Sequence, residues 1–246
     1  MLRLIVFSIE KLNLTTLLQL SNGGNVMKYK SVFDIIGPIM IGPSSSHTAG
    51  AAKIGRVARN LYGKEPKKTI ISLYGSFAKT YRGHGTDVAL VGGLLDFDTF
   101  DERIPQSIDI ANEKGMSVEF IVEDAITEHP NTVKISIIDD EQPFELVGIS
   151  IGGGKIEIVE LNGFELKLSG NYPAILVVHN DRFGSIAGVT NVLMKYAVNI
   201  GHMEVSRKEV GQIALMAIEV DQDLDDKILK EIESLPHIIR VTKMVD

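Results

Sequence analysis

Cysteine and tryptophan are both absent from the 246 residues of this chain. Without a thiolate the chain forms no disulfide and ligates no iron–sulfur cluster or cysteine zinc site of its own. No apolar run approaches the roughly 18 residues that a membrane helix needs, so no membrane span is expected. Lys and Arg never occur more than two in a row and the net charge is −7, which disfavours nucleic acid as a partner. The expected partner is therefore a small molecule or another protein, and the lack of cysteine fits a reducing cytoplasm.

The first 26 residues are expected to be an N-terminal extension. Charged residues interrupt their apolar stretch and no small-residue cleavage site follows, which disfavours a signal peptide. A Gly-Gly pair just upstream of Met27 is what a purine-rich ribosome-binding sequence would encode if it were translated. We therefore expect Met27 to be the true start, and detection of Met1 by mass spectrometry of the native protein would contradict this.

Residues 27–168 show a mixture of helix-like and strand-like patterns. Apolar residues at helical spacing predict a helix over 48–62, and Gly63 is its expected end. Residues 27–168 therefore favour a mixed α/β domain, and 1–26 precede it. The other expected helices are 86–95 and 106–114, and the expected strands are 68–74, 117–123, 132–138, 145–151 and 155–161.

Residues 174–246 have a different order of elements, strand, helix, two strands, helix and strand. This βαββαβ order is typical of a ferredoxin-like domain. The expected boundary is a linker over 167–173, and the whole chain is expected to be an α+β protein of two domains. The expected strands are 174–179, 200–207, 212–220 and 238–244, and the expected helices are 186–197 and 224–235.

The strongest local motif places Ser44, Ser45, Ser46, His47 and Thr48 at the start of a helix. Helix N-termini leave free N–H donors, so this loop could hold a carboxylate or a phosphate. An imidazole there could transfer a proton. The alternative is a plain N-cap, but one serine suffices for capping, so we favour a binding or catalytic site.

Two further motifs are weaker on their own. His84 lies between glycines that permit a close approach of the backbone, and Thr86 follows at the start of another helix, where simple capping is the alternative. His129 and Asn131 flank a proline in a segment that reads by default as a surface turn.

Three pattern matches are rejected on physical grounds. Ser150 matches a nucleophile elbow, but a strand rather than a helix follows it. Ser76 and Lys79 match a β-lactamase pair without its partner motifs, and His202 matches half of a zinc-deaminase motif in a chain without cysteine.

The first loop of the second domain contains Asn180, Asp181, Gly184 and Gly188. Polar groups and glycines at such a position could wrap the carboxylate and ammonium of an amino acid. A structural turn that serves only self-association is an equally good interpretation.

Four segments together resemble a known family. They are GPSSSHTAGAAKIGRVAR at 42–59, YGSFAKTYRGHGTD at 74–87, EHPNT at 128–132 and VGISIGGGKIEI at 147–158. They resemble the beta chain of the iron–sulfur-dependent L-serine dehydratases, and residues 174–246 resemble the ACT domain of that family.

The resemblance implies a lyase that converts L-serine to pyruvate and ammonia. It also implies an alpha chain that carries a four-iron four-sulfur cluster, so that metal ligands are expected on that partner and none on this chain. The lack of cysteine agrees with this division. By this resemblance Ser46, His47 and Thr48 would reach the alpha-chain site, with His47 as base or substrate binder. The weaker candidates for substrate contact are Ser44, Ser45, His84, Thr86, His129 and Asn131.

Two other functions remain open at this point. The first domain also resembles the allosteric substrate-binding domain of some D-3-phosphoglycerate dehydrogenases. This likeness implies a regulatory module that binds serine or a small anion. A free-standing amino-acid-binding protein is a third, weaker hypothesis. The ACT domain is expected to mediate association between copies of the chain and to bind its regulatory ligand at Asn180, Asp181, Gly184 and Gly188.

Overall fold

The computed structural model describes residues 40–139 and 144–244. The extension over 1–26 and the question of Met1 or Met27 as the start lie outside these residues. The described chain contains two β-sheets with helices packed against them, so the expected α+β class is confirmed. The second sheet belongs to the βαββαβ domain that the order of sequence patterns predicts.

The first sheet has six strands in the order β2-β1-β3-β4-β5-β6. β1 pairs with β2 in parallel, and all the other neighbours are antiparallel. Alternate residues of the central strands are buried, because one face of the sheet packs against helices and the other does not. The strands are β1 (Lys68–Leu73), β2 (Ser117–Val122), β3 (Thr132–Ile137), β4 (Phe144–Gly152), β5 (Lys155–Leu161) and β6 (Phe164–Leu168).

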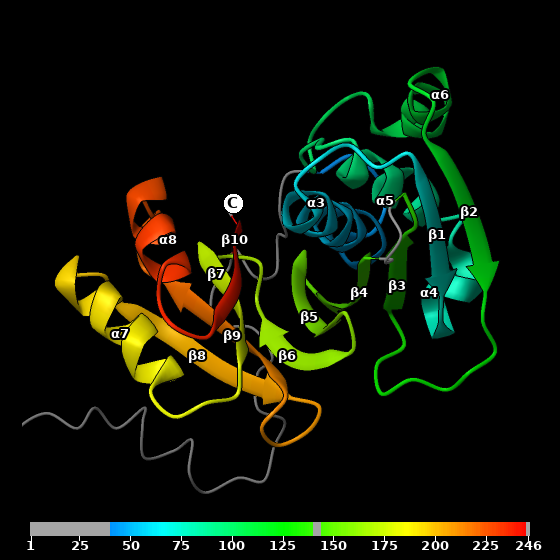
Figure 1. Ribbon diagram of the computed structural model, residues 1–246. Helices are drawn as coiled ribbons and strands as arrows, with labels where there is room; N and C mark the ends of the chain where they lie inside the picture. Colours follow the sequence, from blue (N-terminus) through cyan, green and yellow to red (C-terminus); the bar gives the residue numbers. More distant parts are fainter. Residues whose placement is uncertain (1–39, 140–143, 245–246) are drawn as a thin grey trace, which may run out of the picture. The chain divides into compact units, whose positions relative to one another are not determined.

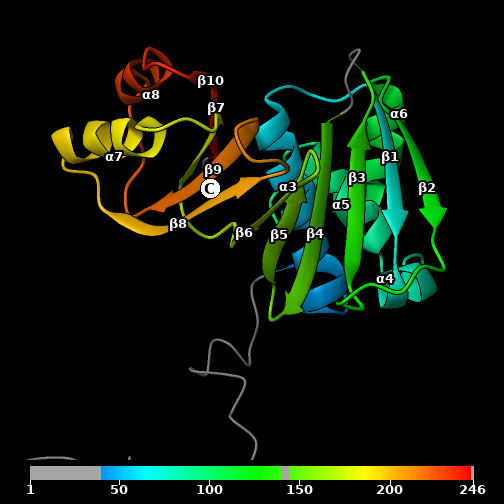
Figure 2. The ribbon, with the colours of Figure 1, turned by 60° about the horizontal axis from the view of Figure 1, so that its bottom comes forward.

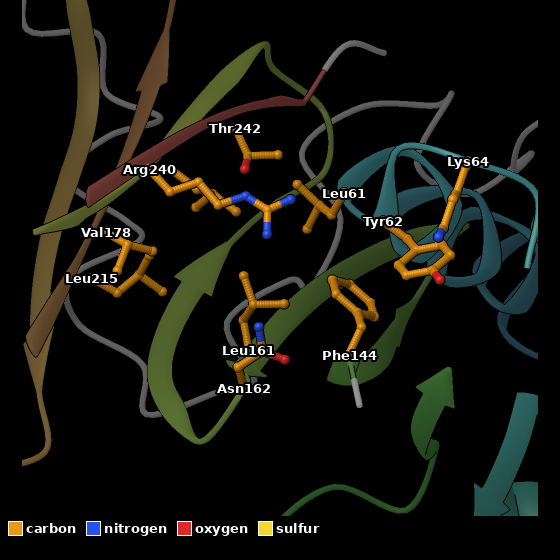
Figure 3. A pocket seen from close by; sticks show the side chains of 11 residues that line it. Leu61, Tyr62, Lys64, Phe144, Leu161, Asn162, Val178, Leu215, Arg240 and Thr242 are labelled. Atoms are coloured by element: carbon orange, nitrogen blue, oxygen red, sulfur yellow. The ribbon is translucent and has the colours of Figure 1, made fainter. Parts of the chain in front are cut away.

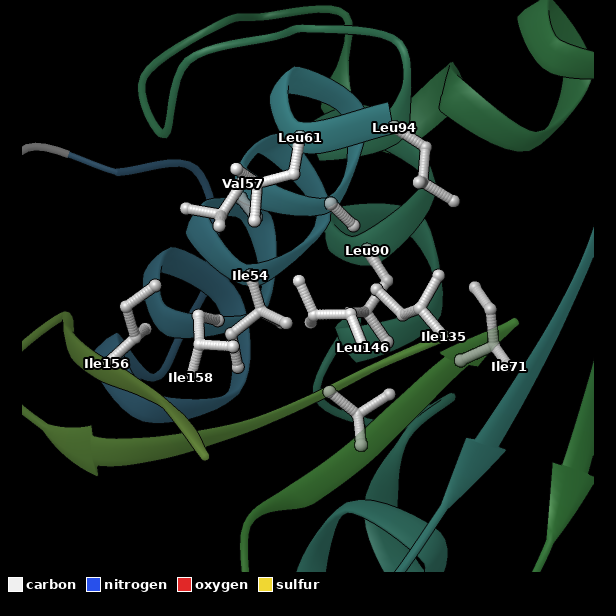
Figure 4. Close-up of a cluster of buried hydrophobic side chains, with 14 of the residues drawn as sticks. Ile54, Val57, Leu61, Ile71, Leu90, Leu94, Ile135, Leu146, Ile156 and Ile158 are labelled. Carbon is white, nitrogen blue, oxygen red and sulfur yellow. The ribbon is translucent and has the colours of Figure 1, made fainter. Parts of the chain in front are cut away.

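Helices α3 (Gly50–Tyr62) and α5 (Thr86–Leu94) cover that buried face, as Figures 1 and 2 show. Figure 4 shows apolar side chains of these helices meeting those of β1, β3, β4 and β5 in one core. Ile54, Leu90 and Leu146 are fully buried in it. Burying side chains of this size contributes roughly 1.5–3 kcal/mol each, so this core is the main support of the site described below. The remaining elements on this part are η1 (Ser45–Ala49), α4 (Gly75–Thr80), η2 (Ile104–Gln106) and α6 (Ser107–Glu113).

The second sheet has the order β10-β7-β9-β8, with every neighbouring pair antiparallel. Helices α7 and α8 pack on one of its faces, where Val177, Met216 and Ile232 are fully buried. The elements are β7 (Ala174–Asn180), α7 (Ser185–Lys195), β8 (Ile200–Arg207), β9 (Ile213–Val220), α8 (Asp226–Glu233) and β10 (Ile238–Met244).

The sequence analysis did not predict helix α4, the short helix η2 or strand β6. Helices α4 and η2 have only six and three residues, too few to show a helical apolar period, whereas β6 (FELKL) does alternate apolar and charged residues at the edge of its sheet. Because β6 ends at Leu168, the connection to β7 is shorter than the linker expected over 167–173. No helix in the described ranges is long and apolar enough to cross a membrane.

Candidate functional site

The loop before α3 folds into a π-helical turn, Ser45–Ala49, with Ser44 as its N-cap. The Ser44 hydroxyl accepts a hydrogen bond from the His47 backbone N–H at 3.4 Å. The Thr48 hydroxyl donates to the Ser44 carbonyl, so it serves the turn rather than facing a ligand. Capping is therefore present, as the simpler interpretation predicts, but it uses only part of the polar groups of this loop.

The imidazole of His47 is surrounded by serine hydroxyls. Its Nδ1 lies 3.2 Å from Ser44 Oγ and 3.1 Å from Ser46 Oγ. Its Nε2 lies 3.1 Å from the hydroxyl of Ser76, 29 residues further along the chain. Both ring nitrogens are thus hydrogen-bonded within the protein, and the side chain is 8% exposed.

A second imidazole lies directly beside the first. The rings of His47 and His84 have their centroids 4.7 Å apart and cross at 80°, and Phe77 contacts the His47 ring from another side. Burial lowers the pKa of His47, and the neighbouring His84 lowers that pKa further. His47 is therefore held neutral at physiological pH.

His84 differs from His47 in its hydrogen bonding. Its Nδ1 is buried and has no hydrogen-bond partner among the described residues. Buried polar atoms are nearly always paired, so an unpaired one marks either strain or a position where a ligand or water completes the bond. The structure thus brings together two histidines from separate sequence motifs and leaves one nitrogen open.

Thr86 is the first residue of α5, two residues after this histidine. The interpretation of Thr86 as a capping residue is wrong, because the N-cap is Gly85 and no side chain caps this helix. The Thr86 hydroxyl is fully buried and has no partner among the described residues. The backbone donors here are already used, since Thr86 N–H donates to Tyr81 O and Val88 N–H to the Asp87 carboxylate.

Ser76, which we had rejected as part of a β-lactamase pair, is the residue that sequence reasoning missed. It occupies the second position of α4, and its N–H donates to Pro130 O at 2.6 Å. Gly75 precedes it at a φ of 55°, and a Cβ there would lie 2.5 Å from the same carbonyl. Only glycine permits this approach, so the segment around His129 fixes the position of Ser76. Its place inside one of the four family-like segments was the available signal.

Asn131 and Ser150 join two further segments to the cluster. Asn131 Nδ2 donates to Ser150 O, and Ser150 N–H donates to Asn131 O at 3.0 Å. A Cβ on Gly50 would lie 2.1 Å from Ser150 Oγ, so strand β4 packs directly against the start of α3. Ser150 is a strand residue, as expected, and its buried hydroxyl has no partner among the described residues.

The remaining candidates of the first domain lie at the edge of this cluster. Ser45 opens the π-helical turn, and its hydroxyl has no hydrogen bond to another described residue. His129 Nδ1 accepts a hydrogen bond from the Asn131 N–H at 3.1 Å, which organises the turn. His129 also lines a groove of about 590 Å³ on the helix-free side of β4 and β5, together with Glu128, Ile149 and Glu157.

The candidate ligand loop of the second sheet is already hydrogen-bonded to the end of β8 and to the turn that follows it. Asp181 accepts hydrogen bonds from the Gly211 N–H at 2.9 Å and from Arg207 at 3.0 Å. These two donors, Gly211 first, lower the pKa of the Asp181 carboxyl. The Asn180 carbonyl accepts from the Ser185 hydroxyl, Gly184 has a φ of 88°, and Gly188 faces Leu235.

The residues present do not fit an iron–sulfur cluster. The chain has no cysteine, and the described residues contain no group of three or more His, Asp or Glu side chains that could hold a metal ion. The cluster implied by the resemblance therefore finds no donor set here.

A separate hollow of about 340 Å³ lies away from these residues (Figure 3). Apolar side chains line it together with Lys64, Asn162, Arg240 and Thr242, and none of the residues expected to act in a site lies in it. We do not assign the chemistry to this hollow, because the open polar atoms lie around His84.

The arrangement of the chain defines a class of protein, an α+β domain with a serine- and histidine-rich site joined to an ACT domain. Residues 174–237 match the family model of the ACT domain. Residues 31–160 match the family model described as "Serine dehydratase beta chain". The chain belongs to the serine dehydratase beta-chain family.

Individual relatives agree with this assignment. The chain is 71% identical over 220 residues to a probable L-serine dehydratase beta chain of Bacillus subtilis, which covers 89% of this chain and 100% of the relative. It is 38% identical over 201 residues to the L-serine dehydratase beta chain of Peptoniphilus asaccharolyticus, covering 80% and 90% of the two chains. A D-3-phosphoglycerate dehydrogenase of Bacillus subtilis is 29% identical over 203 residues, covering 80% of this chain and 37% of that protein.

Proposed function

We propose that this chain is the beta subunit of an iron–sulfur L-serine ammonia-lyase and supplies active-site residues to a cluster-bearing alpha subunit. The reaction converts L-serine to pyruvate and ammonia. The observation that carries the proposal is the buried, unpaired Nδ1 of His84 beside an imidazole whose two nitrogens are both occupied.

Removal of the Cα proton of serine needs a base with a free lone pair. His84 Nδ1 is buried without a hydrogen-bond partner among the described residues, so in the tautomer that carries its proton on Nε2 this nitrogen offers a free lone pair. His47 is our first expectation for this role from the sequence. Its nitrogens are engaged by Ser46 and Ser76, which favours His84 as the base and His47 as its neutral neighbour.

The charge of His47 affects how readily the neighbouring His84 accepts a proton. If His47 were cationic, its charge less than 5 Å from His84 would oppose protonation of the base. The lowered pKa of His47 removes this repulsion. A proton taken from the substrate can then reside on His84.

The substrate needs hydrogen-bond donors as well as a base. Among the described residues the hydroxyls of Ser45 and Thr86 have no protein partner, and Thr86 is fully buried two residues from His84. We assign these hydroxyls to the carboxylate of serine. Since this chain has no cysteine, the cluster belongs to the alpha subunit.

The test is serine dehydration under strict anaerobic conditions, by the chain alone and after mixing with a cluster-loaded alpha chain. Activity is expected only in the mixture. In that complex His84→Ala should lower kcat by about 100-fold or more, the usual size of a general-base contribution. His202→Ala, at an exposed histidine of the second sheet, is the matched control and should leave kcat unchanged.

Two outcomes would contradict the proposal. A verified complex without activity would exclude the lyase function. A complex in which His47→Ala abolishes turnover while His84→Ala retains it would exchange the roles of the two histidines.

A second candidate function rests on the likeness to D-3-phosphoglycerate dehydrogenase over 80% of this chain. In that case the chain is a regulatory subunit that binds serine or a small anion. The His84→Ala variant would then change the cooperativity of serine dependence and leave kcat at saturating serine nearly intact.

A further inference from the structure

The Ser76 hydroxyl approaches His47 from a part of the chain outside the serine motif. It lies 3.1 Å from His47 Nε2, on the side of the ring opposite Ser44 and Ser46. The backbone fixes the position of Ser76. The Ser76 N–H donates to Pro130 O, and a Cβ at Gly75 would clash with the same oxygen. The contact is therefore held by the backbone of two segments rather than by a mobile side chain.

The hydroxyls around His47 are compatible with its Nε2–H tautomer. Two hydroxyls face Nδ1, those of Ser44 and Ser46, and they lie 3.3 Å from each other. In the tautomer whose Nδ1 accepts from one of these hydroxyls, Nε2 carries the proton. The Nε2–H then donates to Ser76 Oγ, which has no other hydrogen-bond partner among the described residues.

The ring of His47 also has an alternative partner. His84 Nδ1 is buried and has no hydrogen-bond partner among the described residues, and the two rings lie 4.7 Å apart between centroids. An Nε2–H released from Ser76 would be buried without an acceptor, which is costly, and a turn of the ring toward His84 would relieve that cost. Such a bond would occupy the lone pair that the proposed base needs.

We infer that Ser76 is a positioning residue, which holds His47 in the Nε2–H tautomer and so keeps the Nδ1 lone pair of His84 free. The inference rests on the proposed function, because it assigns His84 as the base. It adds a residue that the serine–histidine motif does not contain.

The first measurement is nitrogen-15 NMR of the histidine rings in the full chain, which needs neither the alpha chain nor turnover. The wild type should show His47 as the Nε2–H tautomer. In Ser76→Ala the ring nitrogen shifts of both His47 and His84 should change, whereas Ser76→Thr should restore them.

Thr80→Ala is the matched control. The Thr80 hydroxyl donates to the Ser76 carbonyl at 2.8 Å, so this variant perturbs the same short helix without removing the contact to His47. It should leave the ring shifts unchanged. If Ser76→Ala does not fold, Ser76→Cys keeps the size of the side chain with a weaker acceptor and should give a smaller shift in the same direction.

The second measurement is turnover in the complex. Ser76→Ala should lower kcat about tenfold, the equivalent of one hydrogen bond, while KM for serine changes much less. Unchanged His47 and His84 shifts in Ser76→Ala would overturn this inference while leaving the proposed function intact. A wild-type complex without activity would instead contradict the proposed function itself.

Discussion

The two sheets of this chain differ in how many buried polar atoms near them lack a hydrogen-bond partner among the described residues. Around the first sheet, Thr69 Oγ1, His84 Nδ1, Thr86 Oγ1 and Ser150 Oγ are buried without a hydrogen-bond partner among the described residues. In the second sheet only His179 Nε2 is in this position within the described ranges. In the loop of the second sheet that was expected to bind a ligand, Asp181 is already paired with Arg207 at the end of β8.

The region around the first sheet therefore has buried polar atoms without hydrogen-bond partners, whereas the Asp181 carboxylate of the second sheet already has its partners. An unpaired buried atom costs free energy until a ligand or water bonds to it, so the first region gains from an occupant. A ligand at the second region must instead compete with an existing ion pair. The comparison therefore supports the proposal that the chemistry lies at the first sheet.

The sharpest test of the comparison exchanges buried hydroxyls for methyl groups. Thr86→Val should lower kcat/KM for serine about tenfold in the complex, because it removes one donor to the substrate. Unfolding in urea should show no loss of stability, since the lost hydroxyl has no protein partner.

The control for this change is Thr69→Val, in strand β1. Thr69 is 1% exposed and its hydroxyl is equally unpaired among the described residues. This variant should be as stable as the wild type, or more stable by about 1 kcal/mol, with unchanged kinetics. Equal losses of activity in both variants would show that the Thr86 hydroxyl has no special role.

A second effect is the pH dependence of stability. Because the folded protein lowers the pKa of His47, the unfolded chain binds a proton first as the pH falls below about 6.5. Stability is therefore full above that pH and is lost as the pH falls through the lowered pKa. His47→Gln should flatten this dependence below about pH 6.5, measured as the midpoint of urea unfolding.

Exposed His202 provides the comparison for that experiment. His202→Gln should leave the slope of stability against pH as it is in the wild type. A wild-type slope retained by His47→Gln would mean that the buried imidazole does not control acid stability.

The smallest effect is expected at the second sheet. Asp181→Asn weakens the contact with Arg207 at the protein surface, where ion pairs contribute little to stability. Turnover at saturating serine should remain unchanged, and only the serine concentration dependence of the complex should shift. A loss of kcat as large as that of Thr86→Val would break the distinction between the two regions.

Much of the fold follows from local patterns. The apolar stripe from Ala51 to Leu61 predicts α3, and Gly63 ends the helix in the left-handed conformation that favours glycine. The βαββαβ order of the second domain is also read from the sequence, because each of its elements is long enough to show a period. Helix α4 is too short for that and depends on its tertiary contacts, whereas β6 alternates apolar and charged residues and was predictable from this pattern.

The site was predictable only in part, because some of its residues lie far apart in the sequence. Ser44, Ser46 and His47 are neighbours in sequence, so a helix start brings them together. Ser76 reaches the same imidazole from 29 residues away, through a glycine turn packed on Pro130. The residues around Ser76 match a rejected catalytic pattern and one of the family-like segments, and neither indicates a contact with His47.

By itself the sequence determined that this chain cannot ligate a cysteine-bound cluster, because it has no cysteine, and that a serine–histidine motif stands before a helix. Only the tertiary structure decided which imidazole nitrogen is occupied and which is free. The reason is physical: hydrogen bonds saturate, and whether Ser76 reaches His47 depends on how β3, α4 and the loop before α3 pack together. The sequence places polar groups along the chain, and packing decides which of them are left unpaired.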